Sequence, residues 1–206
     1  MKKRELDHVL RAAGGITGEK QFIIIGNQAL HGSYPDLADH IVESAEVELF
    51  APLKPGRTEW LNAIGVYSQF HATFGYYADP VDETTVTLAA GWKGRLVDLP
   101  AGNTAVKGLC LEPHDLAIAK YVASREKDPV FNSELARRGL VSAERLLALL
   151  QRTAVDDEVR ERIRVQITND FRADRSRDSV NREPAQLPPI ATTPARARMT
   201  TSSNDA

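Results

Sequence analysis

The stretch Phe22-Ile23-Ile24-Ile25-Gly26-Asn27-Gln28-Ala29 decides the fold that we expect for this chain. Four large apolar residues, three of them β-branched, run without a break into a glycine. This pattern is typical of a strand that is buried on both faces. The residues from Asn27 to His31 favour a short helix after that strand. The stretch therefore predicts a buried central strand, a glycine turn and then a helix.

The next strand is predicted from Ala45 to Ala51, where side chains alternate between two faces. Glu46 and Glu48 then lie on the same face, and one divalent cation can sit between them. The same alternation also fits an edge strand with one solvated face, and for two glutamates alone that is the more common arrangement. Spacing by itself does not decide between a metal site and a solvated face.

The remaining patterns predict helices at both ends of the folded part and extended segments between them. We expect a helix that Gly14-Gly15 terminates, a helical turn within 36–42, a helix over 58–68, extended segments near 75–77, 85–88 and 95–99, a strand over 106–111, and helices over 113–126, 129–138 and 142–152. This order predicts an α+β fold, with a mixed central sheet flanked by helices and a C-terminal helical part from about residue 113.

Composition changes near residue 170, where Pro, Ser, Thr and Arg replace most large apolar residues. Such a segment buries too little apolar surface to offset its chain entropy. We therefore expect one folded domain over 1–168 and a disordered tail over 170–206.

Overall composition excludes several classes of protein. With 26 Lys and Arg against 28 Asp and Glu, the net charge of −2 provides no general basic field for nucleic acid or anionic membranes. The single cysteine, Cys110, cannot form an internal disulfide and suits a reducing compartment. No stretch approaches the roughly 20 apolar residues of a membrane span, and no signal peptide is recognisable. We expect a soluble, cytoplasmic protein without a membrane contact.

The strand, the glycine turn and the acidic pair on the following strand together resemble the nucleotidyltransferase superfamily. In that superfamily a Gly-Gly or Gly-Ser turn follows the first strand, and a carboxylate pair on the next strand holds the metal. Gly26-Asn27 matches the turn best and Gly32-Ser33 is the alternative. A glycine at this turn lets triphosphate oxygens approach the amides of the helix. The resemblance implies Mg²⁺ or Mn²⁺ on Glu46 and Glu48, with a nucleoside triphosphate at the turn.

A second block, over residues 111–128, strengthens the resemblance. Its Pro-x-Asp-Leu, Lys and Arg-x-Lys-Asp pattern is similar to a segment of abortive-infection-type nucleotidyltransferase toxins and of a related bacterial nucleotidyltransferase-like family of unknown function. In those relatives the helix lysine lies over the nucleotide phosphates, and a later aspartate is a third acidic residue near the site. These residues would be Lys120 and Asp128 here. Arg125 and Lys127 are implied as further contacts to the nucleotide.

The resemblance implies an enzyme that transfers a nucleoside monophosphate from a nucleoside triphosphate to a hydroxyl group on RNA or protein. Its toxin-like relatives imply a tRNA end or a partner protein as the acceptor, and a cognate antitoxin. This chain has Glu-x-Glu where active members usually have Asp-x-Asp. The alternative is therefore a catalytically degenerate member that binds a nucleotide or a partner protein.

Two of the candidate residues also have simpler interpretations. Asp128 directly precedes Pro129, so that its carboxylate could be the N-cap of the next helix. Lys120 could be an exposed helix cation. A single carboxylate at Asp128 can serve both as a cap and in the site.

Overall fold

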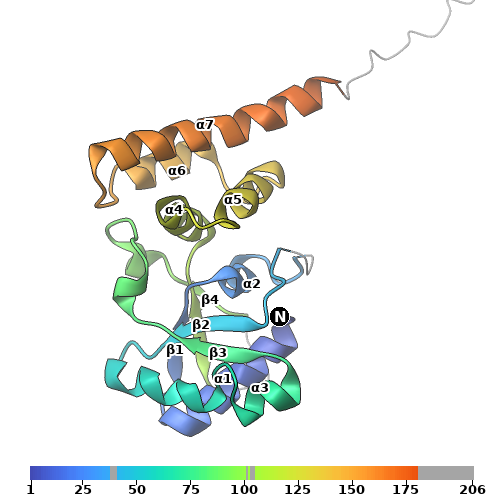
Figure 1. Ribbon diagram of the computed structural model, residues 1–206, viewed down its shortest axis with the longest axis vertical. Helices are drawn as coiled ribbons and strands as arrows, with labels where there is room; N and C mark the ends of the chain where they lie inside the picture. The colour runs from blue at the N-terminus through green and yellow to red at the C-terminus, as the bar shows by residue number, and fades with distance from the viewer. Residues whose placement is uncertain (38–40, 101, 103–104, 181–206) are drawn as a thin grey trace, which may run out of the picture.

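The computed structural model of the chain describes residues 1–37, 41–100, 102 and 105–180, with side chains as far as residue 172. A five-stranded sheet lies at its centre in the order β3-β2-β1-β5-β4 (Figure 1). The strands are β1 (Gln21–Ile24), β2 (Glu46–Phe50), β3 (Tyr77–Pro80), β4 (Val97–Asp98) and β5 (Lys107–Cys110). β1 is parallel to β5 and antiparallel to β2, and β2 is parallel to β3. The predicted α+β fold with a mixed sheet is confirmed.

The central strand is β1, as its apolar run predicts. Phe22 and Ile24 are fully buried and Ile23 is nearly so, because both faces of β1 are covered and both edges are paired. The chain then turns at Gly26 into the short 3-10 helix η1 (Asn27–Ala29) and α2 (Leu30–Ser33). The predicted turn and short helix are therefore present at the end of the central strand.

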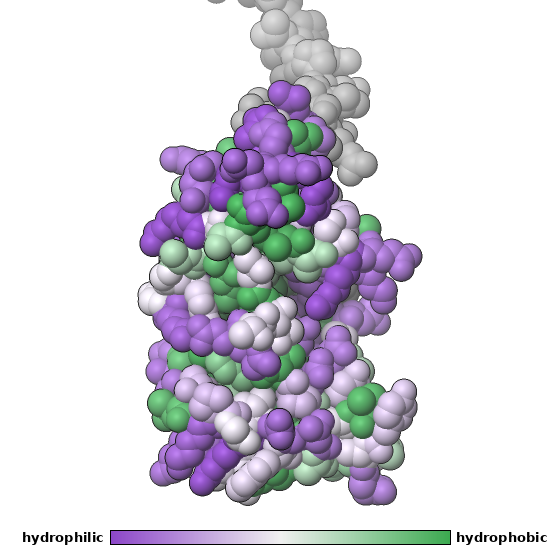
Figure 2. Space-filling view, turned by 60° about the vertical axis from the view of Figure 1, so that its left-hand side comes forward, coloured by the Kyte–Doolittle hydropathy of each residue, from purple (hydrophilic) through white to green (hydrophobic). Residues whose placement is uncertain are grey.

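Helices form layers on either side of the sheet. Figure 1 shows α1 (Lys3–Thr17) and α3 (Gln69–Phe74) on one side and α2 on the other, with the C-terminal helices beyond α2. The C-terminal helices are α4 (Pro113–Ala123), α5 (Asp128–Arg137), α6 (Ala143–Leu150) and α7 (Asp157–Val180). α4 packs against α5 and α6, and α7 packs across both. On the face shown in Figure 2, hydrophilic residues cover the upper end, where α7 lies, and apolar residues reach the surface further down.

Several boundaries differ from the predicted ones for physical reasons. α1 continues through Gly14 to Thr17 and ends at Gly18, which adopts a left-handed conformation. Gly14 serves close packing instead, because a Cβ atom there would lie 2.5 Å from a methyl group of Val106. α4 ends at Ala123 rather than at residue 126, because Ser124 adopts a left-handed conformation and donates its N–H to the Lys120 carbonyl oxygen.

Other segments have a different structure from the predicted one. The helix predicted over 58–68 is the 3-10 helix η2 (Pro55–Ile64) followed by α3. The extended segment near 85–88 follows the short 3-10 helix η3 (Glu83–Thr85) and joins no strand of the sheet. The turn predicted within 36–42 includes residues 38–40, which lie outside the described residues.

At the C-terminal end, α7 continues to Val180, past the predicted domain boundary at residue 168. The rest of the predicted tail, residues 181–206, lies outside the described residues. Among the described helices, none is long and apolar enough to cross a membrane.

Candidate functional site

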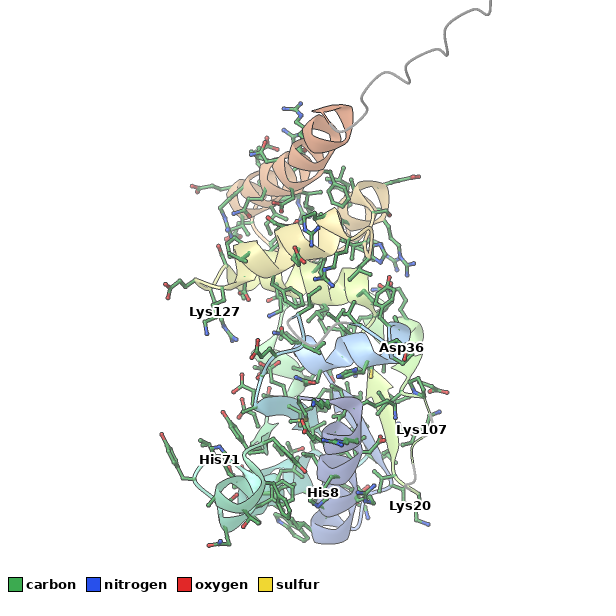
Figure 3. All side chains as sticks on the ribbon, turned by 90° about the vertical axis from the view of Figure 1, so that its right-hand side faces the viewer. His8, Lys20, Asp36, His71, Lys107 and Lys127 are labelled. Atoms are coloured by element: carbon green, nitrogen blue, oxygen red, sulfur yellow. The ribbon has the colours of Figure 1, made fainter. Side chains whose placement is uncertain are left out.

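A cleft of about 340 Å³ lies between the sheet and the helical part. Its sheet side is the end of β1 and the polar face of β2, and its other side is the turn between α4 and α5. Figure 3 shows Lys127 on this turn, between the C-terminal helices and the sheet. Eight of the nine candidate residues line the cleft, namely Gly26, Asn27, Glu46, Glu48, Lys120, Arg125, Lys127 and Asp128.

Ser33 is the candidate residue that the cleft does not include. It ends α2, where a side chain on the preceding Gly32 would lie 2.7 Å from Cys110 of β5. The Gly32-Ser33 segment is therefore a packing contact with β5, and Gly26-Asn27 is the turn that lines the cleft.

The two glutamates are not on a solvated edge strand. β2 lies between β1 and β3, and Phe50 on the glutamate face is only 5% exposed. Glu46 and Glu48 are both half-buried, and the hydroxyl of Tyr77 on β3 donates a hydrogen bond to Glu46 Oε2 at 2.9 Å. The pair thus forms a partly desolvated acidic wall of the cleft.

Asp79 is a further acidic residue that the sequence reasoning missed. β2 and β3 pair in parallel with Glu48 opposite Asp79, so the Asp79 side chain lies on the same face as both glutamates. Burial raises the pKa of Asp79, and the charge of Glu46 raises it further while Arg125 opposes the shift. Local alternation over 76–80 could have indicated the face, but not the pairing of β3 with β2.

The charges around Glu46 and Glu48 fit a divalent cation. Burial raises the pKa of Glu48, Lys120 opposes this shift, and the neighbouring Glu46 raises the pKa again. Among the described residues no three His, Cys, Asp or Glu side chains are grouped closely enough to enclose a metal ion. Mg²⁺ often takes only one or two carboxylates from the protein and completes its octahedron with substrate phosphate and water. Glu46 and Glu48 fit that kind of site.

Gly26 has a specific role beside Glu48. A Cβ atom at residue 26 would lie 2.6 Å from Glu48 Oε2 and 2.9 Å from its carboxyl carbon. Only a residue without a side chain lets the Glu48 carboxylate lie against the backbone of the turn. The glycine and the second glutamate are therefore one structural unit, although they are far apart in the sequence.

On the opposite side of the cleft, Lys120 and Asp128 form a partly buried ion pair. Lys120 Nζ lies 3.2 Å from Asp128 Oδ1, and the Arg125 backbone N–H donates to Asp128 Oδ2 at 2.9 Å. The Lys120 side chain is 18% exposed and its ammonium group lies 4.6 Å from the centre of the Phe131 ring. Lys120 is thus not an exposed helix cation, and Asp128 is its counter-ion.

Asp128 does not cap α5 as the sequence suggested. It is the first residue of α5, Lys127 precedes it as the cap residue, and both carboxylate oxygens of Asp128 are engaged by Lys120 and Arg125. The turn instead presents exposed Arg125 and Lys127 at the cleft. Arg125 and Lys120 are both close enough to Glu48 to lower its pKa. The cleft therefore has cations on its helical side and carboxylates on its sheet side.

Comparison with known proteins gave one family match. Residues 4–177 match the family described as "Nucleotidyltransferase of unknown function (DUF6036)". The matched range includes every strand of the sheet and both sides of the cleft. No match was found among the curated proteins or among the solved structures.

Proposed function

Since the chain belongs to this family of nucleotidyltransferases, we propose that it transfers a nucleoside monophosphate from a nucleoside triphosphate to a hydroxyl group on RNA or protein. One observation carries the proposal, namely the cleft in which cations of the α4–α5 turn face the carboxylates of β2. A triphosphate that bridges a divalent cation and basic side chains needs this arrangement.

Basic residues of the helical side would hold the phosphates. Lys120, Arg125 and Lys127 line the same cleft as the Gly26-Asn27 turn, so a triphosphate there contacts both charge and backbone. Lys120 is held by Asp128, which reduces the conformational entropy lost when it meets a phosphate. Preorganised cations of this kind stabilise the charge of the transferred phosphoryl group.

Glu46 and Glu48 would hold Mg²⁺ or Mn²⁺. A bound divalent cation would neutralise phosphate charge and polarise the α-phosphoryl group. The protein's own contribution is to keep the two carboxylates on one face of β2 and to exclude part of the solvent from them.

A narrower space of about 110 Å³ adjoins the cleft and suits the nucleobase. It shares Gly26, Glu48 and Lys120 with the cleft and extends between residues 85–87 and α4. Its walls include Val86, Leu116, Ala119 and Val122, whose apolar surfaces can pack against the faces of a base.

In the transfer step, the acceptor oxygen attacks the α-phosphorus and the bond to the β-phosphate oxygen breaks, so that pyrophosphate leaves. The proton of the acceptor hydroxyl passes to a carboxylate. Asp79 is suited to receive it, because it lies on the glutamate face but outside the pair that would hold the metal. A tRNA or protein acceptor and an antitoxin partner stay predictions.

The proposal is tested by titrating each of the four nucleoside triphosphates into the protein by calorimetry, with and without Mg²⁺. We expect binding that requires Mg²⁺ in the wild type and is lost in Glu46→Ala/Glu48→Ala. Glu59→Ala/Glu158→Ala, which removes two exposed carboxylates, is the matched control and should bind like the wild type.

Transfer is then measured with triphosphates labelled at the α-phosphate. Label in RNA or protein fractions identifies the acceptor class. Binding without transfer would favour the alternative of a degenerate binding protein, whereas a folded wild type that binds no triphosphate would contradict the proposal.

A further inference from the structure

We propose that Tyr77 is a positioning residue that fixes the Glu46 carboxylate for metal binding, and so allows Glu-x-Glu to serve where an aspartate pair would be expected. This inference rests on the proposed function, because it concerns the same metal site. It assigns a role to a residue of β3 that lies outside both sequence motifs.

The physical difficulty is the length of glutamate. Its side chain has one more rotatable bond than aspartate, and functional ligands must be held to within about 0.5 Å. A freely rotating Glu46 would lose conformational entropy on every metal-binding event. Some contact has to restrict it beforehand.

Tyr77 provides that contact. In the parallel pairing of β2 and β3, Tyr77 lies directly opposite Glu46, and its hydroxyl donates to Glu46 Oε2 at 2.9 Å. The hydrogen bond engages one carboxylate oxygen and leaves Oε1 for a cation. Ligating carboxylates in metal sites are commonly oriented by such a neighbouring donor.

Tyr77 is itself held in place. Its ring lies against the imidazole of His71 in α3, with 4.6 Å between ring centroids. His71 Nδ1 in turn accepts a hydrogen bond from the backbone N–H of Tyr67. Figure 3 shows His71 on the same side of the molecule as Lys127. These contacts hold the Tyr77 hydroxyl where it donates to Glu46 Oε2.

Glu48 is restricted by a different contact. Its carboxylate lies against the backbone of Gly26, where no side chain could fit. The two glutamates are thus fixed independently, one by a hydrogen bond from β3 and the other by steric contact with the turn after β1. A change at Tyr77 should act on Glu46 alone.

The test compares Tyr77→Phe with Tyr76→Phe. The two tyrosines are adjacent in the sequence, and each substitution removes one hydroxyl group. The Tyr76 hydroxyl is hydrogen-bonded to His8 Nδ1 at 2.8 Å, away from the glutamate face. Binding of a triphosphate is measured by calorimetry over a range of Mg²⁺ concentrations. For Tyr77→Phe the Mg²⁺ concentration that gives half-maximal binding should rise about 10- to 100-fold, the usual effect of losing such an orienting partner. For Tyr76→Phe it should stay within about twofold.

Three further measurements separate positioning from a general structural effect. Thermal unfolding of the metal-free proteins should give similar midpoints for the two variants, and excess Mg²⁺ should restore triphosphate binding to Tyr77→Phe. In a Glu46→Ala background, Tyr77→Phe should change the Mg²⁺ dependence no further, because its effect passes through Glu46.

The outcomes distinguish the inference from the proposed function. A wild type that shows no Mg²⁺-dependent triphosphate binding refutes the proposed function and this inference with it. A wild type that binds as expected, together with a Tyr77→Phe variant of unchanged Mg²⁺ dependence, overturns the role of Tyr77 and leaves the proposed function standing.

Discussion

Replacing Asp128 by Asn separates the two roles that this carboxylate could have. As a third metal ligand, Asp128 would be needed for Mg²⁺-dependent binding. As the counter-ion of Lys120, it would be needed mainly for stability. The substitution keeps the shape of the side chain and removes its charge, and the oxygen of the introduced amide can still accept the Arg125 N–H.

The expected loss of stability follows from the geometry. At 3.2 Å and an effective dielectric constant of about 20, the ion pair attracts by about 5 kcal/mol before desolvation is subtracted. Breaking a fully buried pair from one side costs about 3–5 kcal/mol. Since the Lys120 side chain is still 18% exposed and keeps some water, we expect a loss of about 2–3 kcal/mol.

The assay is thermal unfolding followed by circular dichroism, together with calorimetry of triphosphate binding. For a chain of this size the midpoint should fall by about 4–12 °C, while the Mg²⁺ requirement stays that of the wild type. Lys120→Met in the Asp128→Asn background should recover part of the stability, because no uncompensated charge remains. An Asp128→Asn protein that is as stable as the wild type but has lost its Mg²⁺ dependence would refute the counter-ion assignment.

Three other expectations concern single substitutions. Gly26→Ala should abolish Mg²⁺-dependent binding in calorimetry and lower stability by about 1–3 kcal/mol, since the new methyl group displaces the Glu48 carboxylate; wild-type binding would contradict the contact. Tyr67→Asn should raise the free energy of unfolding by about 1 kcal/mol in urea titrations, because Tyr67 has a φ of 64° that Asn tolerates better and its ring is 93% exposed. An unchanged or lower free energy of unfolding would show that the Tyr67 ring contributes to stability. Hydrogen bonds from Arg137 and Arg138 lower the pKa of Glu134 to about 2, so the stability that its carboxylate contributes is present above about pH 4.5 and is lost as the pH falls toward 2. Glu134→Gln should therefore lower the free energy of unfolding by up to about 1 kcal/mol at pH 7 and match the wild type near pH 2. Unfolding measured across that pH range checks this expectation.

Local patterns in the sequence were sufficient for the parts of the fold that depend on neighbouring residues. The apolar run from Phe22 marks β1 because it is buried on both faces, and the alternation around Glu46 and Glu48 marks β2. The turn at Gly26 could be predicted because this glycine directly follows the apolar run of β1. Sequence reasoning also selected most of the residues that line the cleft, through the resemblance of two motifs.

What the sequence did not reveal depends on contacts between distant segments. Asp79 and Tyr77 join the site only because β3 pairs in parallel with β2, and no periodicity encodes that choice of partner. The close approach of Val106 explains why a glycine stands at position 14 inside α1, where the sequence indicated a helix end. Asp128 lines the same cleft as the other candidate residues, yet its partners could be identified only from the geometry of the α4–α5 turn.

The parallel pairing of β1 with β5 has a consequence for the chain while it is being made on the ribosome. Gln21 pairs with Lys107, so one edge of the most apolar strand stays open until β5 has been synthesised. At about 5–20 residues per second, the interval between these two strands takes roughly 4 to 17 s. An open edge of β-branched residues is a template for pairing with another chain. Aggregation is therefore a greater hazard for the nascent chain than for the finished protein, in which β2 and β5 close both edges of β1.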